Sequence, residues 1–165
     1  MMITFRSASI NDVELLRHWD EQPHVIETNP NDDWDWSAEL QSQHDWLELL
    51  IAEFDGRPIG FLQIMDPARD ENRYWGDIEQ GHRAIDIWIG EADDLGKGYG
   101  TAMMKLGIER CFSNPDVHAI LVDPLAANAQ AHRFYEKNGF RFLEERTFGS
   151  DHCHVYRLNR NDMNH

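Results

Sequence analysis

The sequence predicts an α/β fold in which helices flank a mixed β-sheet. Two observations carry this prediction. Runs of β-prone residues are interleaved with segments of helical periodicity over the 165 residues. In addition, the Asp55-Gly56 dipeptide separates the apolar runs 46–54 and 58–65, which indicates a hairpin of two adjacent strands. No linker, repeat or low-complexity segment divides the chain, so we expect one domain over residues 1–165.

The chain begins with a strand-like run over residues 3–6. Ser9 or Asn11 then caps a helix that ends near residue 20 and carries apolar residues at helical spacing. Residues 23–35, rich in Asn, Asp and Pro, are expected to be the least ordered segment. A short helix over 38–44 is expected to lead to the hairpin.

Strands and helices alternate beyond the hairpin, after a long polar and aromatic loop over 66–82. The next strand, 83–90, places three isoleucines on one face and Ala84, Asp86 and Trp88 on the other. The elements that follow are a helix that ends at 112, a strand over 117–123, a helix over 128–137 that ends at Asn138-Gly139, and strands over 140–145 and 153–158.

Composition indicates a cytoplasmic globular protein. Hydrophobic residues make up 41% of the chain, and no apolar run approaches the roughly 20 residues of a membrane span. Residues 1–10 lack the apolar core of a signal peptide, so we expect no export. Two cysteines favour a reduced compartment over a disulfide scaffold. No cysteine and histidine set has the spacing of a zinc site, so His152-Cys153-His154 is interpreted as structural and no metal is expected.

The formal net charge of −15 argues against a nucleic-acid partner, because phosphates are repelled by an acidic surface. The same field attracts and concentrates a cationic small molecule. Solubility alone is the alternative explanation of this charge, and the sequence leaves both open.

The segment Leu95 to Thr101 reads Leu-Gly-Lys-Gly-Tyr-Gly-Thr and precedes a helical pattern. Three alternate glycines allow backbone N–H groups to converge on one anion at the positive end of the helix. The spacing matches neither a Walker loop nor the dinucleotide fingerprint. The segment therefore predicts a pyrophosphate site of another kind, or a turn without a ligand.

Asn128 to Phe140, read together with the glycine loop, resembles the GNAT superfamily of N-acetyltransferases. The matching features are the asparagine, the alanine three residues later, the tyrosine seven residues later and the Tyr-Glu-Lys-x-Gly-Phe ending. One position departs from the pattern, because Leu95 stands where the family usually has Gln or Arg. The resemblance implies a mostly antiparallel sheet that splays between the strands at about 83–90 and 117–123.

Further motifs are similar to those of the aminoglycoside 6'-N-acetyltransferases. They are Leu-Gly-Lys-Gly-x-Gly-Thr, residues 55–60, residues 83–86, Asn114-Pro115-Asp116-Val117 and Asp123-Pro124. The same branch includes acyltransferases that modify a hydroxylysine amine in siderophore biosynthesis. The resemblance implies transfer of an acetyl group from acetyl-CoA to a primary amine of a cationic small molecule. Cys111 lies among apolar residues of a helix and is interpreted as a core residue and not as a covalent intermediate, so we expect direct transfer in a ternary complex.

The resemblance also implies which residues bind the cosubstrate. The glycine loop would hold the pyrophosphate, the free edge of the strand at 83–90 would hold the pantetheine arm, and Asn128 would contact that arm or only cap its helix. The cofactor-binding residues expected on this basis are Ile87, Trp88, Ile89, Leu95, Gly96, Lys97, Gly98, Tyr99, Gly100, Thr101, Asn128, Ala131 and Tyr135.

Two residues are expected to be catalytic. Tyr135 lies where the family places the general acid for the departing thiolate, although a tyrosine packed in the core with its hydroxyl on a backbone carbonyl would give the same pattern. Asp86 is an acid in an isoleucine-rich strand, where a carboxylate needs a partner or a polar cleft. It would hold the substrate amine and receive its proton, or it would form an ion pair with Arg83 or another base.

The expected substrate-binding residues are Trp34, Glu71, Glu79, Asp86 and Asp123. Packing alone would explain Trp34, and turn formation before Pro124 would explain Asp123. Three functions stay open: an aminoglycoside 6'-N-acetyltransferase, an N-acetyltransferase of another amine (a siderophore precursor, a polyamine, a protein lysine or N-terminus), and a non-enzymatic acyl-CoA-binding module. The protein is expected to be a monomer or a homodimer, with no membrane partner.

Overall fold

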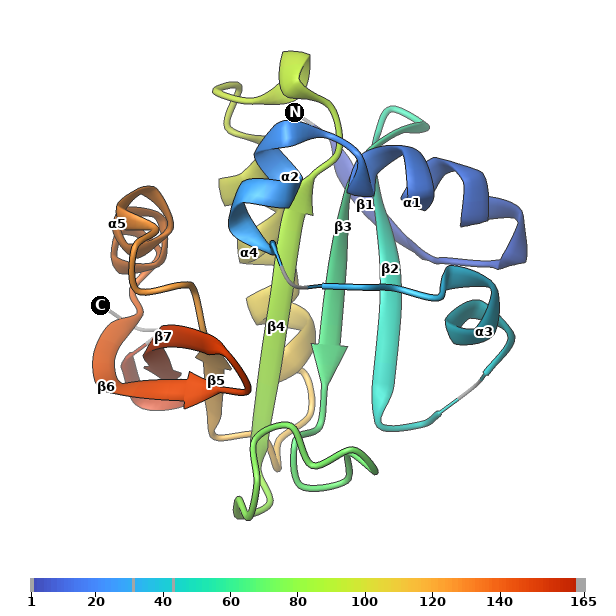
Figure 1. Ribbon diagram of the computed structural model, residues 1–165. Coiled ribbons are helices and arrows are strands. Elements are labelled where there is room, and N and C mark those ends of the chain that lie inside the picture. The colour runs from blue at the N-terminus through green and yellow to red at the C-terminus, as the bar shows by residue number, and fades with distance from the viewer. Residues whose placement is uncertain (1, 31, 43, 163–165) are drawn as a thin grey trace.

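The computed structural model describes residues 2–30, 32–42 and 44–162, which form a seven-stranded sheet with helices on both faces (Figure 1). The strands are β1 (Ile3–Ser7), β2 (Leu47–Phe54), β3 (Arg57–Met65), β4 (His82–Ile89), β5 (Ala119–Val122), β6 (Arg141–Phe148) and β7 (Asp151–Asn159). The helices are α1 (Val13–Asp20), α2 (Pro23–Thr28), α3 (Trp36–Gln41), α4 (Tyr99–Phe112) and α5 (Ala129–Lys137), with short 3-10 turns at Ile10–Asp12, Ala92–Asp94 and Arg160–Asp162.

The sheet order is β1-β2-β3-β4-β5-β7-β6, and only the β4–β5 pair is parallel among the described strands. β4 pairs with β3 over residues 84–89 but with β5 only over 82–84. Figure 1 shows β4 between the two parts of the sheet, with β5, β7 and β6 grouped beside α5. The predicted α/β fold with a mostly antiparallel, splayed sheet is therefore confirmed.

The alternation predicted for β4 decides which helices cover which face. Ile85 packs with α4 residues such as Met104, and Ile87 and Ile89 pack beside Met103. Trp88, on the opposite face, packs against α1 and α3 in a cluster that includes Trp19, Trp36 and Phe61. Asp86 shares this second face, on which the acidic N-terminal segments also lie.

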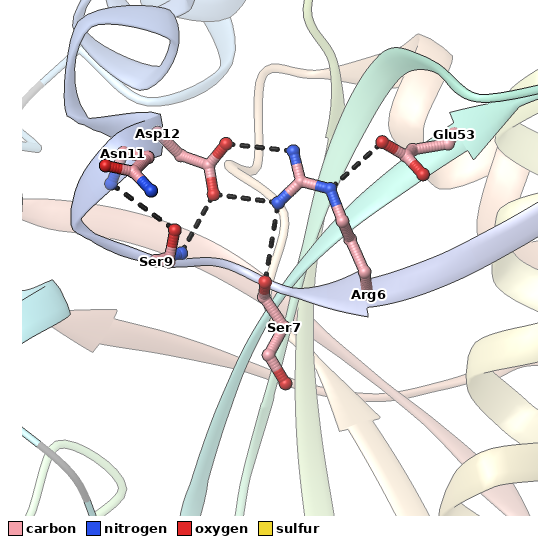
Figure 2. Close-up of polar contacts among 6 residues, drawn as sticks. All are labelled: Arg6, Ser7, Ser9, Asn11, Asp12 and Glu53. Carbon is pink, nitrogen blue, oxygen red and sulfur yellow. Dashed lines mark hydrogen bonds and ion pairs between the residues drawn. The ribbon is translucent and has the colours of Figure 1, made fainter.

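A network of charges fastens the N-terminal strand to the first helical turn (Figure 2). Arg6 donates to both carboxylate oxygens of Asp12 at 2.8 and 2.9 Å, and its Nε donates to Glu53 on β2 at 2.9 Å. Ser9 is the cap residue: its backbone N–H donates to Asp12 Oδ2 at 2.8 Å, and its hydroxyl accepts from Asn11 N. The Arg6 guanidinium holds the pKa of Asp12 below its usual value.

The hairpin prediction is confirmed, because β2 and β3 pair antiparallel around Asp55 and Gly56, whose φ angles are 49° and 87°. Two adjacent residues with positive φ give the turn that matches the twist of paired strands. The loop prediction also agrees, since no helix or strand lies between β3 and β4 in the described chain.

Several sequence-based boundaries are wrong. The segment expected to be least ordered contains α2, which starts at a proline in its first turn and buries Val25. The short helix expected over 38–44 is α3, where Asp35 caps the backbone at Ala38; residue 43 lies outside the described residues. The strand expected over 117–123 is the shorter β5. No helix within the described ranges is long and apolar enough to cross a membrane.

Candidate active site

The glycine loop presents a row of unused backbone donors. Gly96 and Gly98 have φ angles of 75° and 82°, a conformation that L side chains rarely adopt. Gly98 is the N-cap residue of α4, and the N–H of Ala102 is the first in this region to find a helical carbonyl, Gly98 O at 3.1 Å. The N–H groups of residues 96–101 donate to no acceptor in the described part of the chain. The loop and the helix dipole therefore offer the backbone donors and the positive end of a helix that an anion site needs.

Lys97 adds a positive charge at the edge of this loop. Its ammonium lies 3.9 Å from Asp94 Oδ1, and Asp94 also receives two bonds from Arg57 at 3.0 and 3.1 Å. The buried Asp94 carboxylate is thus neutralised by Arg57, which leaves the exposed Lys97 available to an anion above the loop.

A cavity of about 1390 Å³ extends from the glycine loop, along β4, to the acidic N-terminal segment. Beyond Ala84, β4 has no strand neighbour on its β5 side in the described chain, so the edge of residues 85–88 carries backbone groups without a strand partner. Ile89 O instead accepts a bond from His24 Nε2 at 2.8 Å. The free edge of β4 lines the cavity between the glycine loop and α5. The splay of the sheet therefore creates a slot that an extended, amide-containing molecule can join by strand addition.

Two carboxylates lie at the floor of the cavity without a cationic partner among the described residues. Asp86 accepts a bond from the Gln63 amide at 3.2 Å, and Asp123 accepts one from the Tyr74 hydroxyl at 2.5 Å. Arg83, the partner considered for Asp86, instead pairs with Asp66 at 3.2 Å. Burial, with the charge of Asp32 in addition, raises the pKa of Asp86 to about 7. Burial and the neighbouring charge of Asp86 raise the pKa of Asp123 well above its usual value.

Tyr135 comes from α5 and lines the same cavity. Its ring packs against Phe134, Phe140 and Tyr156. Burial raises the pKa of its hydroxyl, and the negative charges of Asp86 and Asp123 raise it further. The hydroxyl is therefore protonated at neutral pH, as a proton donor must be.

The two ends of the cavity differ in charge. Among the described lining residues, the lysine and arginine side chains are Arg133 and Lys137, both on α5. The acidic lining residues are Glu27, Asp32, Asp33, Glu39, Asp70, Glu71, Asp86, Asp94, Asp123 and Asp151. An anionic molecule suits the end with the glycine loop and α5, and a polycation suits the acidic end.

The match to a family model identifies the fold and the chemistry together. Residues 9–148 match the model of an acetyltransferase (GNAT) domain. The chain belongs to the GNAT family. This membership confirms the sequence-based prediction of an acyltransferase of the GNAT type that takes acetyl-CoA as its cosubstrate.

Curated relatives of this GNAT protein act on two kinds of amine. The chain is 30% identical over 154 residues to aminoglycoside N(6')-acetyltransferase type 1 of Klebsiella pneumoniae, covering 84% of this chain and 73% of the relative. It is 25% identical over 161 residues to lysine N-acyltransferase MbtK of Mycobacterium tuberculosis, covering 93% and 75%.

Solved structures agree with the fold over nearly the whole chain. Aminoglycoside acetyltransferase AAC(6')-Ib in complex with coenzyme A superposes with a TM-score of 0.86 at 27% identity, covering 99% of this chain and 98% of that one. The complex of the same enzyme with coenzyme A and kanamycin gives the same values.

The residues of this GNAT chain fit the cosubstrate. The unpaired N–H groups of 96–101 suit a pyrophosphate, and the free edge of β4 suits the amides of a pantetheine arm. Asn128 does cap α5, since its Oδ1 accepts from Ala131 N at 3.1 Å, and it also lines the cavity. Its side-chain amide nitrogen donates to no group in the described chain, so it is available as a donor.

The cavity brings together most of the residues that the sequence singled out. Those in its lining are Trp34, Glu71, Asp86, Ile87, Trp88, Ile89, Leu95, Gly96, Gly98, Tyr99, Gly100, Thr101, Asp123, Asn128, Ala131 and Tyr135. Lys97 and Glu79 are not in the lining. Glu79 offers its backbone carbonyl to His82 Nδ1 at 3.0 Å, and the contact of its carboxylate with a substrate stays a prediction.

Trp34 is both packed and placed in the cavity wall. Its ring stacks on Trp36 with centroids 4.4 Å apart and planes 3° apart, and it lies 6.2 Å from the rings of Phe61 and Trp88. Trp36 in turn donates to Asp20 at 2.6 Å. The aromatic cluster therefore holds one flat ring against the acidic end of the cavity.

Sequence reasoning missed two contributors to the acidic end. Tyr74, in the loop 66–82, reaches Asp123, and Asp32 lies near enough to raise the pKa of Asp86. Both stand in segments without periodicity, so pattern analysis gives them no role; an acid beside Trp34 was the available signal for Asp32.

Proposed function

We propose that this GNAT protein transfers the acetyl group of acetyl-CoA to a primary amine of a polycationic small molecule, with the 6'-amine of an aminoglycoside as the preferred acceptor. The transfer is direct, in a complex that holds donor and acceptor together. The observation that carries the proposal is the pair of uncompensated carboxylates, Asp86 and Asp123, at the acidic end of a cavity whose other end is an anion site.

The donor end orients the thioester. Backbone N–H groups of residues 96–101 bind the pyrophosphate, and the free edge of β4 aligns the extended arm so that its acyl end lies beside Asp86 and Tyr135 in the cavity. The backbone N–H of Ile87, on the free edge of β4, donates a hydrogen bond to the thioester carbonyl and stabilises the negative charge that develops on its oxygen.

The acceptor end supplies the base. An amine arrives as an ammonium, and the acidic lining attracts it. Asp86, with its pKa raised to about 7, takes one proton at neutral pH and so leaves a nucleophilic nitrogen. The nitrogen attacks the carbonyl carbon, the carbon–sulfur bond breaks, and Tyr135 gives its proton to the departing thiolate. The proton that the attacking nitrogen loses as it becomes an amide returns to Tyr135. Asp123 holds a second ammonium of the same acceptor.

Thiol release from acetyl-CoA in the presence of an amine panel tests the proposal. Kanamycin- and tobramycin-like aminoglycosides are expected to give saturable release and a product acetylated at the 6'-amine. Tyr135→Phe is expected to lower kcat by about a hundredfold while the affinity for coenzyme A stays the same. No release with any aminoglycoside would exclude this acceptor class.

A second acceptor class is an amine of a lysine or hydroxylysine. The observation that favours it is the likeness to a lysine N-acyltransferase over 93% of the chain. The same panel separates the two classes: a lysine-type acceptor carries one reacting amine and one carboxylate, so the acidic cavity should bind it less tightly than an aminoglycoside. Higher kcat/KM with lysine or hydroxylysine would favour the second class.

A further inference from the structure

Tyr74 lies at the end of the cavity in a position that three contacts define. Its hydroxyl donates to Asp123 Oδ2 at 2.5 Å. Its ring stacks on Phe148 with centroids 4.5 Å apart and planes 2° apart. Its backbone N–H donates to the buried Asp70 carboxylate at 3.0 Å. The ring and backbone contacts are independent of the hydroxyl, so the hydroxyl adds something other than anchorage.

The segment around Tyr74 connects the two parts of the splayed sheet. It leaves from β3, and the next residue, Trp75, is buried beside Phe148. Arg146 on β6 donates to Trp75 O at 2.8 Å, and its guanidinium lies 4.8 Å from the centroid of the Phe148 ring. These contacts hold the segment against β6 and keep Tyr74 next to Asp123, which follows β5.

The groups that face Asp123 from every side are acids and weak acids. Asp86 on β4, Asp32 in the N-terminal segment, Cys153 on β7 and Tyr135 on α5 are all electrostatically coupled to it. Tyr74 is the one side chain in the described ranges that donates a hydrogen bond to Asp123. Burial and the charge of Asp86 favour the protonated form of Asp123, and the Tyr74 hydroxyl is the side-chain donor that opposes them.

We propose that Tyr74 is a positioning residue: its hydroxyl holds the Asp123 carboxylate in one orientation, as the anchor for a second ammonium of the acceptor. The proposal rests on the proposed function. A hydrogen bond donated to a carboxylate stabilises the ionised form. Burial and the charge of Asp86 raise the pKa of Asp123, and the hydrogen bond from Tyr74 opposes that rise. Tyr74 thereby favours the ionised form of Asp123 that an acceptor ammonium needs.

Tyr74→Phe tests this role because it keeps the ring, and with it the stack on Phe148, and removes only the hydroxyl. We expect the KM for a polyamine acceptor to rise about tenfold, as expected for one lost hydrogen bond to a charged group, while the KM for acetyl-CoA stays the same. We also expect the acidic limb of kcat/KM to move up by about one pH unit, because the Asp86–Asp123 pair then holds its proton more strongly.

Phe148→Leu is the matched control, since it removes the stack and retains the hydroxyl. It is expected to lower the thermal stability and to leave the pH profile in place. A Tyr74→Phe variant whose acceptor KM and pH profile both equal those of the unmodified protein would overturn the proposal. So would a Phe148→Leu variant that reproduces the pH change.

A titration of the ligand-free protein separates this proposal from the proposed function. Carboxyl NMR of the full chain, without any acceptor, is expected to report a higher pKa for Asp123 in Tyr74→Phe. If no amine in the panel is acetylated but this pKa rises, the proposed acceptor is wrong and the effect of Tyr74 on Asp123 stands. If the pKa is the same in both proteins, the role of Tyr74 is wrong whatever the acceptor.

Discussion

Asp12 and Asp86 are both partly or wholly buried aspartates, but their surroundings shift their pKa values in opposite directions. Asp12 receives two bonds from Arg6 and one from Ser9, and the guanidinium lowers its pKa (Figure 2). Asp86 has one amide donor, Gln63, and burial, together with the charge of Asp32, raises its pKa to about 7.

The difference separates structural from chemical acids. A carboxylate with a full set of donors stabilises the fold and cannot exchange a proton near neutral pH. A carboxylate that is buried without a cation destabilises the folded state, and such a site is retained where a ligand supplies the missing charge. The N-terminal network belongs to the first kind, and the floor of the cavity belongs to the second.

The largest expected effect is on catalysis at Asp86. Asp86→Asn removes the proton acceptor, so kcat/KM for the acceptor amine is expected to fall by a hundredfold or more, about the contribution of a general base. Asp116→Asn is the matched control, because it removes one acid outside the cavity lining. Steady-state thiol release measures both. Equal activities of the two variants would place the proton acceptor elsewhere.

Asp12→Asn is expected to act on stability and not on activity. Breaking a buried ion pair costs about 3–5 kcal/mol, and the expected loss here is about 2 kcal/mol because the Arg6 side chain is 38% exposed. Urea unfolding at neutral pH measures it. Glu53→Gln, which removes the other carboxylate on Arg6, is expected to cost less since it breaks one bond instead of two. A lower kcat/KM of Asp12→Asn at a temperature where the variant is fully folded would contradict a purely structural role of Asp12.

We expect Asp12 and Asp86 to give opposite dependences of the folding stability on pH. Asp12 has a lowered folded-state pKa, so its contribution is present above about pH 3.8 and is lost as the pH falls through its folded pKa. Asp86 keeps its proton to about pH 7 in the folded protein and to about 3.8 in the unfolded chain. Stability should therefore fall as the pH rises between these values, and Asp86→Asn should flatten that fall. Thermal unfolding from pH 4 to 8 measures the slopes; an unchanged slope in the variant would contradict the raised pKa.

Added salt should have the smallest effect. An ammonium-rich acceptor is attracted by the uncompensated acids, and screening between 0.05 and 0.5 M NaCl is expected to weaken its binding about fourfold. Calorimetry in the presence of coenzyme A measures this. The same change in salt should alter the stabilisation by the Arg6–Asp12 ion pair less than it alters acceptor binding, because the two charges are in direct contact. The midpoint of urea unfolding measures that stabilisation. Salt-independent binding would mean that the acidic lining contributes solubility alone.

Local patterns were sufficient to predict much of the fold. The Asp55-Gly56 turn, the alternation of β4 and the helix after the glycine loop depend on neighbouring residues, so they can be inferred from the sequence. Helix α2 was missed because a six-residue helix has little stability of its own, and burial of Val25 against α1 and β4 side chains decides it.

The candidate site divides in the same way. The spacing of the glycine loop indicated a pyrophosphate site, because it prepares backbone donors, and the resemblance of the loop and of Asn128–Phe140 to the GNAT superfamily implied the cosubstrate. The Tyr74–Asp123 bond and the Trp34–Trp36 stack join residues from loops, whose relative positions no local pattern encodes.

The sequence by itself determined the strands, the longer helices and the glycine loop, since each depends on residues within one turn or one strand of each other, and its motifs carried the resemblance that implied the family chemistry. Tertiary structure alone decided which aspartate is neutralised and which is left to titrate. In the folded chain Arg6 pairs with Asp12, and Arg83 pairs with Asp66. Asp86 therefore has no arginine partner, and we assign it a chemical role and not a structural one.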